Sequence, residues 1–590
     1  MTMNRRDALV AGLLSASLMA LLVPLASLGV DQHHDGIMLK PALDVLSGQV
    51  LFRDTFTQYG ALTTYLQVVA LWIQPTLLSM RLMTVMAYGV TLFFLYASWR
   101  LILPRSLTII SCGLFILFIP CFEIDHWTNQ HWLLLPWSSV FAMMFQSIGL
   151  YALFRLISGE QPVRWGMILG LACACVFWCR QPVGVLMTGS VAMIWLALCW
   201  TNWAPVRQSK RSILAGILGG FVAVNALLLG DILISGALPE WWCQNFVWPR
   251  RWSASMNWDN TLRLFLHPTA GTGLLILLLA AAAPGLVKRF RPNLSSRSIM
   301  AYYLCLGGVL VWQYERVFQV LALRDGGWSV LFPLVVLLQA VISLALAFVA
   351  RDTQKTTEYY LVAALAALSL GSLSQYYPMA DSWHMLWALA PAFGLIVFVF
   401  WRGLGWSAPV VALALTAAFL PSIHAKAQSA AQTLARPLVT LAYPSVLRGM
   451  KVPPEQARSL GQIMNLLEQI LRYQPNISSA LIGNDALFLC FTNNHANPSP
   501  YYVTWRGLAD NGHNVERWSN IQQTRPLMFL HRARWGAVDD FYRSARYVPL
   551  LYIPEEALEI AVPQELAETM GLTAYGATPP SGPAKEPLKP

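Results

Sequence analysis

The chain has 590 residues, of which 56% are hydrophobic and only 12% are charged, and its formal net charge is +11 at pH 7. So few charged residues leave too little polar surface for a soluble globule, and the composition therefore predicts a membrane protein. The excess of Lys and Arg is typical of cytoplasmic loops and of contacts with lipid phosphates. No basic stripe with interleaved aromatic residues indicates a nucleic-acid partner, and the 9 cysteines do not suggest a disulfide framework.

The first predicted element is an apolar run over residues 8–30, which directly follows Arg5 and Arg6. A run of this length can cross a membrane, and the two arginines place its N-terminus in the cytoplasm. Its apolar core is too long for a signal peptide, so we expect this helix to be retained.

Twelve more apolar runs follow, and the sequence therefore predicts about thirteen membrane-spanning helices in a polytopic α-helical fold. Each short loop that this topology places inside carries Lys or Arg, as the positive-inside rule requires. An odd number of helices puts the C-terminal part on the outer side, the periplasm of a bacterial cell. The predicted helices lie near residues 8–30, 82–99, 106–122, 132–154, 164–179, 182–200, 212–236, 269–287, 298–313, 328–350, 358–374, 385–401 and 407–424.

The first outward loop covers residues 31–80 and has its own pattern. Residues 41–46 and 62–73 predict short amphipathic helices along the membrane surface, with Gly48 and Gly60 as breaks. A loop of this kind can form a roof over a cavity.

This loop opens with a cluster of ionisable residues at the point where the first helix leaves the bilayer. Ionisable groups cost desolvation energy there, which makes the cluster a candidate functional site. A partly desolvated carboxylate is suited to act as a general base on an acceptor hydroxyl or amine. The alternative is that these residues are ordinary loop polars and helix caps, and we favour it for Asp44 and Asp54. The cluster consists of Asp31, His33, His34 and Asp35.

The order of features in this region resembles that of a known superfamily. An acidic motif follows the first membrane helix, and after it come ALDVLSG at 42–48, LFRD at 51–54 and Tyr59-Gly60. This order is similar to the first loop of the GT-C superfamily of integral-membrane glycosyltransferases. That superfamily includes the protein O-mannosyltransferases and the aminoarabinose transferases that act on lipid A.

The resemblance implies that a sugar passes from a polyprenyl-phosphate donor to an acceptor on the outer membrane face, with an Asp or Glu of the first loop as the base. It assigns that role to Asp35, with Asp31 in reserve, although several relatives have Asp-Glu where this chain has His34-Asp35. The residues expected around the acceptor or behind the base in this loop are His33, His34, Arg53, Asp54 and Tyr59.

The second outward loop is also polar, and it contains Asp125 and His126, which we expect near the acceptor. Together with His33 and His34, these residues could bind a divalent metal such as Mg, Mn or Zn. Scattered histidines are more often hydrogen-bonding residues, and the chain lacks close ligand spacing such as HExxH.

Cations in other outward loops are candidates for holding the donor phosphate. Arg180 and Gln181 follow the fifth predicted helix, and Arg250 and Arg251 lie in a Trp-rich loop. A guanidinium group suits phosphate binding, but an interfacial Arg can equally reach toward lipid headgroups. A third loop adds Asp381 and His384, which could contact the donor phosphate or the acceptor; His384 could also simply mark the interface.

The composition changes after residue 425. Residues 454–473 predict a helix, and residues 480–491, 526–531 and 547–553 predict strands, which suggests a small α/β domain. The Pro-rich end is typical of disorder. We therefore expect a transmembrane GT-C-like catalytic domain at 1–424, a periplasmic α/β domain at 425–575 and a disordered tail at 576–590.

The resemblance, together with the short loops, thus implies a glycosyltransferase of the bacterial inner membrane. Its partners would be a polyprenyl-phosphate sugar donor, membrane lipids and a periplasmic acceptor, which could be a glycolipid, a polysaccharide or a protein. A lipid-linked oligosaccharide polymerase or ligase remains an alternative, because it uses the same chemistry. A non-enzymatic transporter or flippase is a second alternative, but transporters usually bury charge near mid-bilayer, whereas here ionisable residues concentrate in outward loops.

Overall fold

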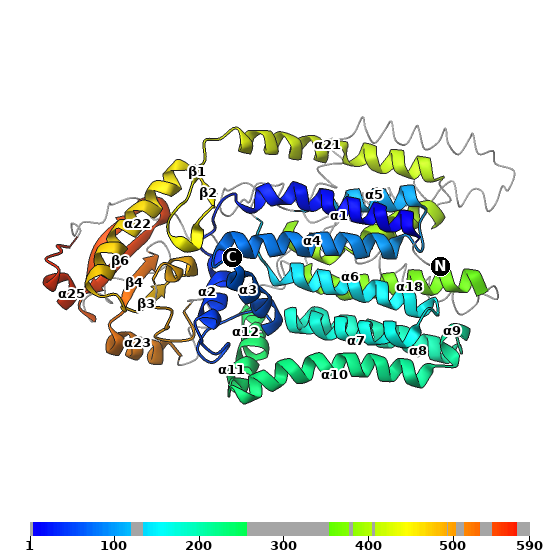
Figure 1. Ribbon diagram of the computed structural model, residues 1–590, viewed down its shortest axis with the longest axis horizontal. Helices are drawn as coiled ribbons and strands as arrows, with labels where there is room; N and C mark the ends of the chain where they lie inside the picture. Colours follow the sequence, from blue (N-terminus) through cyan, green and yellow to red (C-terminus); the bar gives the residue numbers. More distant parts are fainter. Residues whose placement is uncertain are drawn as a thin grey trace.

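The computed structural model describes residues 4–119, 134–255, 353–376, 382–403, 407–492, 494–502, 513–531 and 545–574. These residues form an elongated helical bundle with a mixed α/β unit at one end (Figure 1). The N-terminus lies at the other end of the bundle (Figure 1).

Six helices among the described residues are long and apolar enough to cross a membrane. Each overlaps a helix predicted from the sequence, and α7 and α8 are separated only at Arg180. The six run side by side along the bundle (Figure 1). They are α1 (Arg5–Ala26), α4 (Leu77–Trp99), α6 (Ser138–Ile157), α7 (Pro162–Cys179), α8 (Gln181–Trp200) and α10 (Lys210–Ile234).

Further helices complete the described part of the bundle. The helix predicted at 385–401 is interrupted at Pro391, because proline lacks the N–H that would continue the helix. The predicted helices near 269–287, 298–313 and 328–350 lie outside the described residues, so the total of thirteen stays a prediction. The additional helices are α5 (Arg105–Leu117), the short α9 (Ala204–Arg207), α18 (Thr353–Ser372) with the 3₁₀ helix η3 (Leu373–Tyr376), α19 (Ser382–Leu389), α20 (Ala392–Phe398) with the π-helix η4 (Val399–Gly403), and α21 (Ala408–Leu434).

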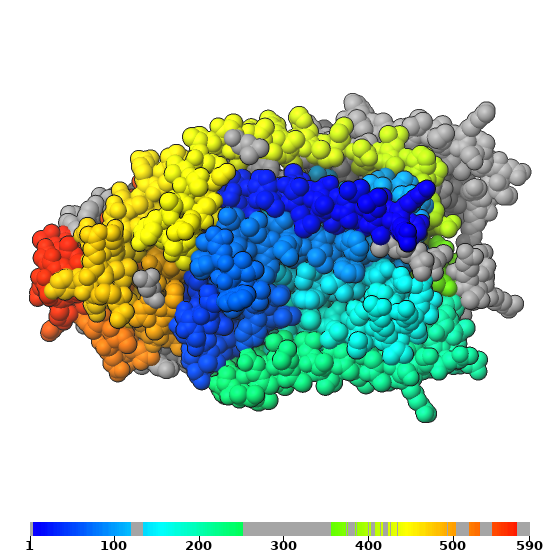
Figure 2. Space-filling model, viewed as in Figure 1, coloured from blue at the N-terminus to red at the C-terminus, as the bar shows by residue number. Residues whose placement is uncertain are grey.

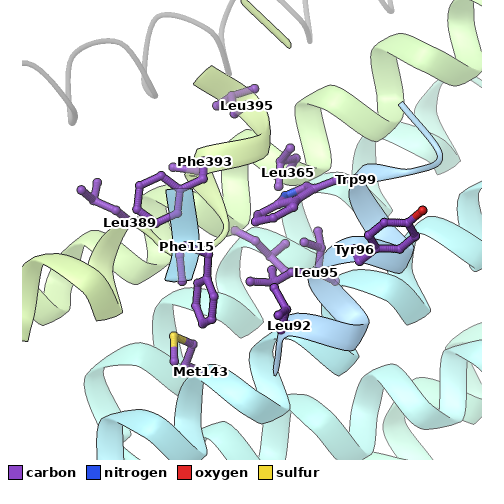
Figure 3. Close-up of a cluster of buried hydrophobic side chains, with 14 of the residues drawn as sticks. Leu92, Leu95, Tyr96, Trp99, Phe115, Met143, Leu365, Leu389, Phe393 and Leu395 are labelled. Carbon is purple, nitrogen blue, oxygen red and sulfur yellow. The ribbon is translucent and has the colours of Figure 1, made fainter. Parts of the chain in front are cut away.

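Large apolar side chains fill the centre of the bundle (Figure 3). Trp99 of α4 is fully buried, and its indole N–H donates a hydrogen bond to the carbonyl oxygen of Pro391 at 3.3 Å. Gly394 of α20 allows this approach, because a Cβ there would lie 2.2 Å from the Trp99 ring. The break between α19 and α20 is therefore part of the core.

Short helices cover the end of the bundle that lies away from the N-terminus (Figure 1). Helices α2 (His34–Leu46) and α3 (Ala61–Ile73) include both amphipathic segments predicted in the first loop. Trp72 and Ile73, at the end of α3, are exposed. At the same end lie α11 (Leu238–Trp242), the π-helix η2 (Cys243–Val247) and α12 (Trp248–Ser255).

The C-terminal unit contains a four-stranded sheet with the order β3-β4-β6-β5, in which only the β3–β4 pair is parallel. The strand predicted at 480–491 is partly wrong: it ends at Ile482, Gly483 follows with φ +145°, and the rest is the 3₁₀ helix η6 (Ala486–Cys490). The sequence did not predict β6. The unit consists of β1 (Val439–Thr440), η5 (Ser445–Leu447), β2 (Lys451–Val452), α22 (Pro454–Tyr473), β3 (Ser479–Ile482), η6, α23 (His513–Thr524), β4 (Leu527–His531), β5 (Tyr547–Ile553), η8 (Pro554–Glu556), β6 (Leu558–Pro563) and α25 (Gln564–Thr569).

This unit packs directly on the first loop, and Figure 2 shows their surfaces in contact. The Lys451 carbonyl accepts a hydrogen bond from the Gly29 N–H at 2.8 Å, just beyond the end of α1. Apolar residues of both parts share one core, among them Met38 and Leu43 of α2 and Leu460 and Phe488 of the C-terminal unit. The first loop is therefore held between the membrane helices and the α/β unit.

Candidate functional site

Asp35, the base implied by the resemblance, forms a fully buried ion pair with Arg81. Its carboxylate accepts hydrogen bonds from Nε and Nη2 of Arg81 in α4, and both side chains are fully buried. The same carboxylate accepts a hydrogen bond from the Asp31 N–H at 2.9 Å. Burial raises the pKa of the Asp35 carboxyl, and the Arg81 guanidinium opposes that rise. Asp35 thus links α2 to Arg81 of α4 and to the backbone of Asp31, and both of its carboxylate oxygens accept hydrogen bonds.

Gly36 lets the C-terminal unit approach this segment. A Cβ at this position would lie 2.1 Å from the backbone nitrogen of Leu487 in η6. Only a residue without a side chain permits this contact between α2 and η6.

Asp31 and His34 form a second pair. The Asp31 Oδ1 atom accepts a hydrogen bond from the His34 N–H and lies 3.2 Å from the His34 Nδ1. Burial acts to raise the pKa of Asp31, but the hydrogen bond and charge from His34 outweigh it and lower that pKa to about 2. Within the described part of the chain, Oδ2 of Asp31 accepts no hydrogen bond, and 28% of the His34 side chain is exposed. This pair is therefore more accessible than the Asp35–Arg81 pair.

A cluster of aromatic rings extends from His34 to helix α19. The His34 ring lies 5.2 Å from Trp137, and Trp137 lies 6.1 Å from His384 and 5.1 Å from Trp387, measured between ring centroids. His33 adds one more ring at 4.6 Å from His34. We call these five residues the His–Trp cluster. It joins the first loop to the residue just before α6 and to α19.

Arg180 borders this cluster from the turn between α7 and α8. Its guanidinium donates a hydrogen bond to the Ser139 hydroxyl and lies 6.0 Å from the centre of the Trp387 ring. Tyr59 lies on another side, 6.3 Å from Trp137, and burial raises the pKa of its phenol to about 12. A cation, an acid–base pair and aromatic surfaces thus meet at one end of the membrane helices.

The structure brings together only part of the predicted site. His34, Tyr59 and His384 contact the Trp137 ring, Asp31 and His33 contact His34, and Arg180 lies over Trp387. Gln181 follows Arg180 but hydrogen-bonds to Asn245. Elsewhere, Arg53 pairs with Asp54, donates to the carbonyl of Ser235 and is partly exposed. Arg250 and Arg251 are exposed on α12.

Three predicted residues, Asp125, His126 and Asp381, lie outside the described residues. The metal site suggested for the second loop therefore depends on residues that are not described. Within the described ranges, no group of three or more His, Cys, Asp or Glu residues could hold a metal ion.

Sequence reasoning missed several residues of this region. Arg81 stands at the start of an apolar helix, and a buried cation there could have been expected to pair with a nearby carboxylate. Trp137, Ser139 and Trp387 carry no local signal, because their position depends on how distant helices pack.

A second buried network lies one helical turn further along α2. Lys40 pairs with Asp44 at i,i+4 spacing, and Asp44 also accepts hydrogen bonds from Thr55 at 2.6 Å and Asn497 at 2.9 Å. Both charged residues are almost completely buried. This network ties α2 to the segment between η6 and α23, so that Asp44 is a buried structural residue and not an ordinary polar residue of a loop.

The comparison with family models found no match, and the comparison with curated proteins found none either. The chain is similar to the crystal structure of ArnT from Cupriavidus metallidurans in the apo state, with 12% sequence identity and a TM-score of 0.38. The similarity covers 94% of this chain and 98% of ArnT. A likeness of this degree does not by itself establish an activity.

Proposed function

We propose that the protein is a membrane glycosyltransferase that moves a sugar from a polyprenyl-phosphate donor to an acceptor at the outer face of a bacterial inner membrane. One observation carries the proposal. A carboxylate–imidazole pair, the buried Asp31 and the partly exposed His34, and the guanidinium of Arg180 both border the His–Trp cluster, at one end of a bundle of apolar helices. Transfer from a lipid-linked donor uses an acid–base group and a phosphate ligand close together at the membrane surface.

In this proposal the Asp31–His34 pair takes up the proton of the acceptor on the imidazole ring, while the Asp31 carboxylate, whose pKa is low, stays ionised beside the ring. General bases must lie within reach of the proton that they take, and a pair that combines carboxylate and imidazole holds the ring in one orientation. Asp35 has both oxygens bound to Arg81 and to the Asp31 backbone, so it fits a supporting role better than the role of base. This reverses the order in which the resemblance ranked the two carboxylates.

In the proposed reaction, each bond that forms is matched by one that breaks, and groups at the site take up the proton and bind the leaving phosphate. The acceptor oxygen or nitrogen forms a bond to the anomeric carbon of the sugar, while the bond from that carbon to the phosphate oxygen breaks. The acceptor proton passes to the Asp31–His34 pair, and polyprenyl phosphate leaves as an anion. Arg180 would bind the phosphate, because a guanidinium group keeps its charge and donates several hydrogen bonds. Trp137 and Trp387 would provide flat apolar surfaces beside the sugar.

The test is the substitution Asp31→Asn in membrane vesicles supplied with a lipid-linked sugar donor. Loss of a general base typically reduces the rate by about 10²–10⁴-fold, and we expect a loss of that size from Asp31→Asn. The matched control is Glu455→Gln, since Glu455 is an exposed carboxylate at the start of α22. Full transfer by Asp31→Asn, with the protein present at the wild-type level, would remove the assignment of the base.

A further inference from the structure

The C-terminal unit holds the segment that carries Asp31 by its backbone. The Leu487 N–H donates a hydrogen bond to the Gln32 carbonyl at 3.1 Å. The His33 Nδ1 lies 2.7 Å from the Asn484 carbonyl oxygen. Gln32 and His33, the two residues that follow Asp31, are therefore held by a part of the chain more than 450 positions away in the sequence.

One side chain of the C-terminal unit reaches this segment as well. Glu556 lies in η8, the turn between β5 and β6, which closes through Ala557 with φ +46°. The Glu556 Oε2 atom accepts a hydrogen bond from the Gln32 side-chain amide at 2.6 Å. Glu556 is half-buried, whereas its neighbour Glu555 on the same turn is exposed. The turn thus directs one of two adjacent carboxylates toward the candidate site.

The surroundings of Glu556 are rich in negative charge. Burial and the nearby carboxylate of Asp485 raise the pKa of Glu556 to about 7, while the hydrogen bond from Gln32 opposes the rise, and Glu555 and Asp31 add further repulsion. Asp485 itself lies 3.6 Å from the Nε2 atom of His531. The carboxylate therefore changes its charge in the neutral pH range, next to the proposed base.

We propose that Glu556 is a positioning residue for Asp31, which it acts on through the side chain of Gln32. This inference rests on the proposed function. Ionised Glu556 binds the Gln32 amide more strongly than the neutral carboxyl does, because hydrogen bonds to charged groups are stronger than neutral ones. It thereby fixes the peptide that carries Asp31, and its negative charge favours uptake of a proton by the Asp31–His34 pair. The C-terminal unit would then contribute directly to the reaction.

The first arm of the test measures the melting temperature of the full-length protein against pH. The folded pKa of Glu556 lies above the unfolded value, so its contribution to stability is complete at low pH and is lost as the pH rises through about 7. Glu556→Gln keeps a hydrogen-bond acceptor but cannot ionise. We therefore expect this variant to melt with the wild type at pH 5 and several degrees above it at pH 8. The control, Glu555→Gln, should follow the wild type at both pH values.

The second arm measures sugar transfer over the same pH range. The wild type should become faster between pH 6 and 8, whereas Glu556→Gln should lack this rise and be roughly five- to tenfold slower at pH 8, as expected when a charged hydrogen bond becomes neutral. A wild-type pH profile in Glu556→Gln would overturn the proposal. Identical melting of the Glu555 and Glu556 variants at every pH would also overturn it, whether or not the protein transfers sugar. A wild-type protein without transfer activity would overturn the proposed function, while the melting temperatures would still report whether Glu556 titrates near neutral pH in the folded protein.

Discussion

Asp35 and Arg81 show how a single residue pair sets the geometry of the segment after α1. Both side chains are fully buried, and Arg81 also donates hydrogen bonds to the carbonyl oxygens of Ala26 and Leu28. Removing one partner of such a pair leaves an uncompensated charge, which costs about 3–5 kcal/mol. We expect Arg81→Met to destabilise the protein by that amount, as measured by thermal unfolding in detergent.

The double variant Asp35→Leu with Arg81→Met provides the control. It removes both charges, so it should recover much of the lost stability. Equal losses in the single and double variants would contradict the ion pair as the source of the effect.

Single residues were also where sequence reasoning was weakest. The cluster Asp31–Asp35 could be recognised, because charge at the end of an apolar helix is unusual. The contacts within it depend on Arg81, which lies 46 positions further along the chain from Asp35, and on Glu556 in the turn between β5 and β6, which binds Gln32. Contacts over such distances leave no local pattern in a single sequence.

At the level of elements, the contact between α2 and η6 is the most sensitive packing feature. Gly36→Ala would place a Cβ against the backbone of η6, which cannot move away as a flexible side chain could. Overpacking of this kind typically costs about 1–3 kcal/mol. We expect faster cleavage between α21 and α22 in limited proteolysis, because the C-terminal unit would detach more readily from the first loop.

Gly113→Ala in α5 is the matched control, since a Cβ there meets no atom within 4 Å. It should leave the cleavage rate unchanged. Equal cleavage of the Gly36 variant and the wild type would show that the α2–η6 contact does not hold the unit in place.

Helices with a regular amphipathic pattern or a long apolar run were predicted well. The amphipathic pattern at 454–473 gave α22 with the observed bounds, and long apolar runs gave α1, α4, α6, α7, α8 and α10. The failures occurred where a local signal was weak or mixed. The stretch 480–491 is mostly apolar, but Gly483, Asn484 and Asp485 divide it, and the strand ends just before them; β6 contains too little alternation to stand out.

At the level of the whole molecule, the N-terminus and the C-terminal unit lie at opposite ends of the helical bundle, and this arrangement predicts that they lie on opposite sides of the membrane (Figure 1). Helix α9 lies at the same end as the N-terminus, and the C-terminal unit lies at the opposite end (Figure 1). If the N-terminus is cytoplasmic, a cysteine in place of the exposed Tyr473 should react with a membrane-impermeant maleimide in intact bacterial cells. A cysteine in place of Arg207 in α9 should react only after the membrane is permeabilised. The opposite pattern would reverse the predicted topology.

The central claim is that the protein cleaves a lipid-linked sugar donor and transfers the sugar. The most direct measurement follows a donor labelled in both the sugar and the polyprenyl chain, in proteoliposomes that contain the purified protein and a mixture of cell-envelope acceptors. We expect the sugar label to move to an acceptor while an equal amount of polyprenyl phosphate appears, and we expect Asp31→Asn to slow both by about 10²–10⁴-fold. Movement of the intact donor across the bilayer, without separation of the two labels, would contradict the claim and identify a flippase instead.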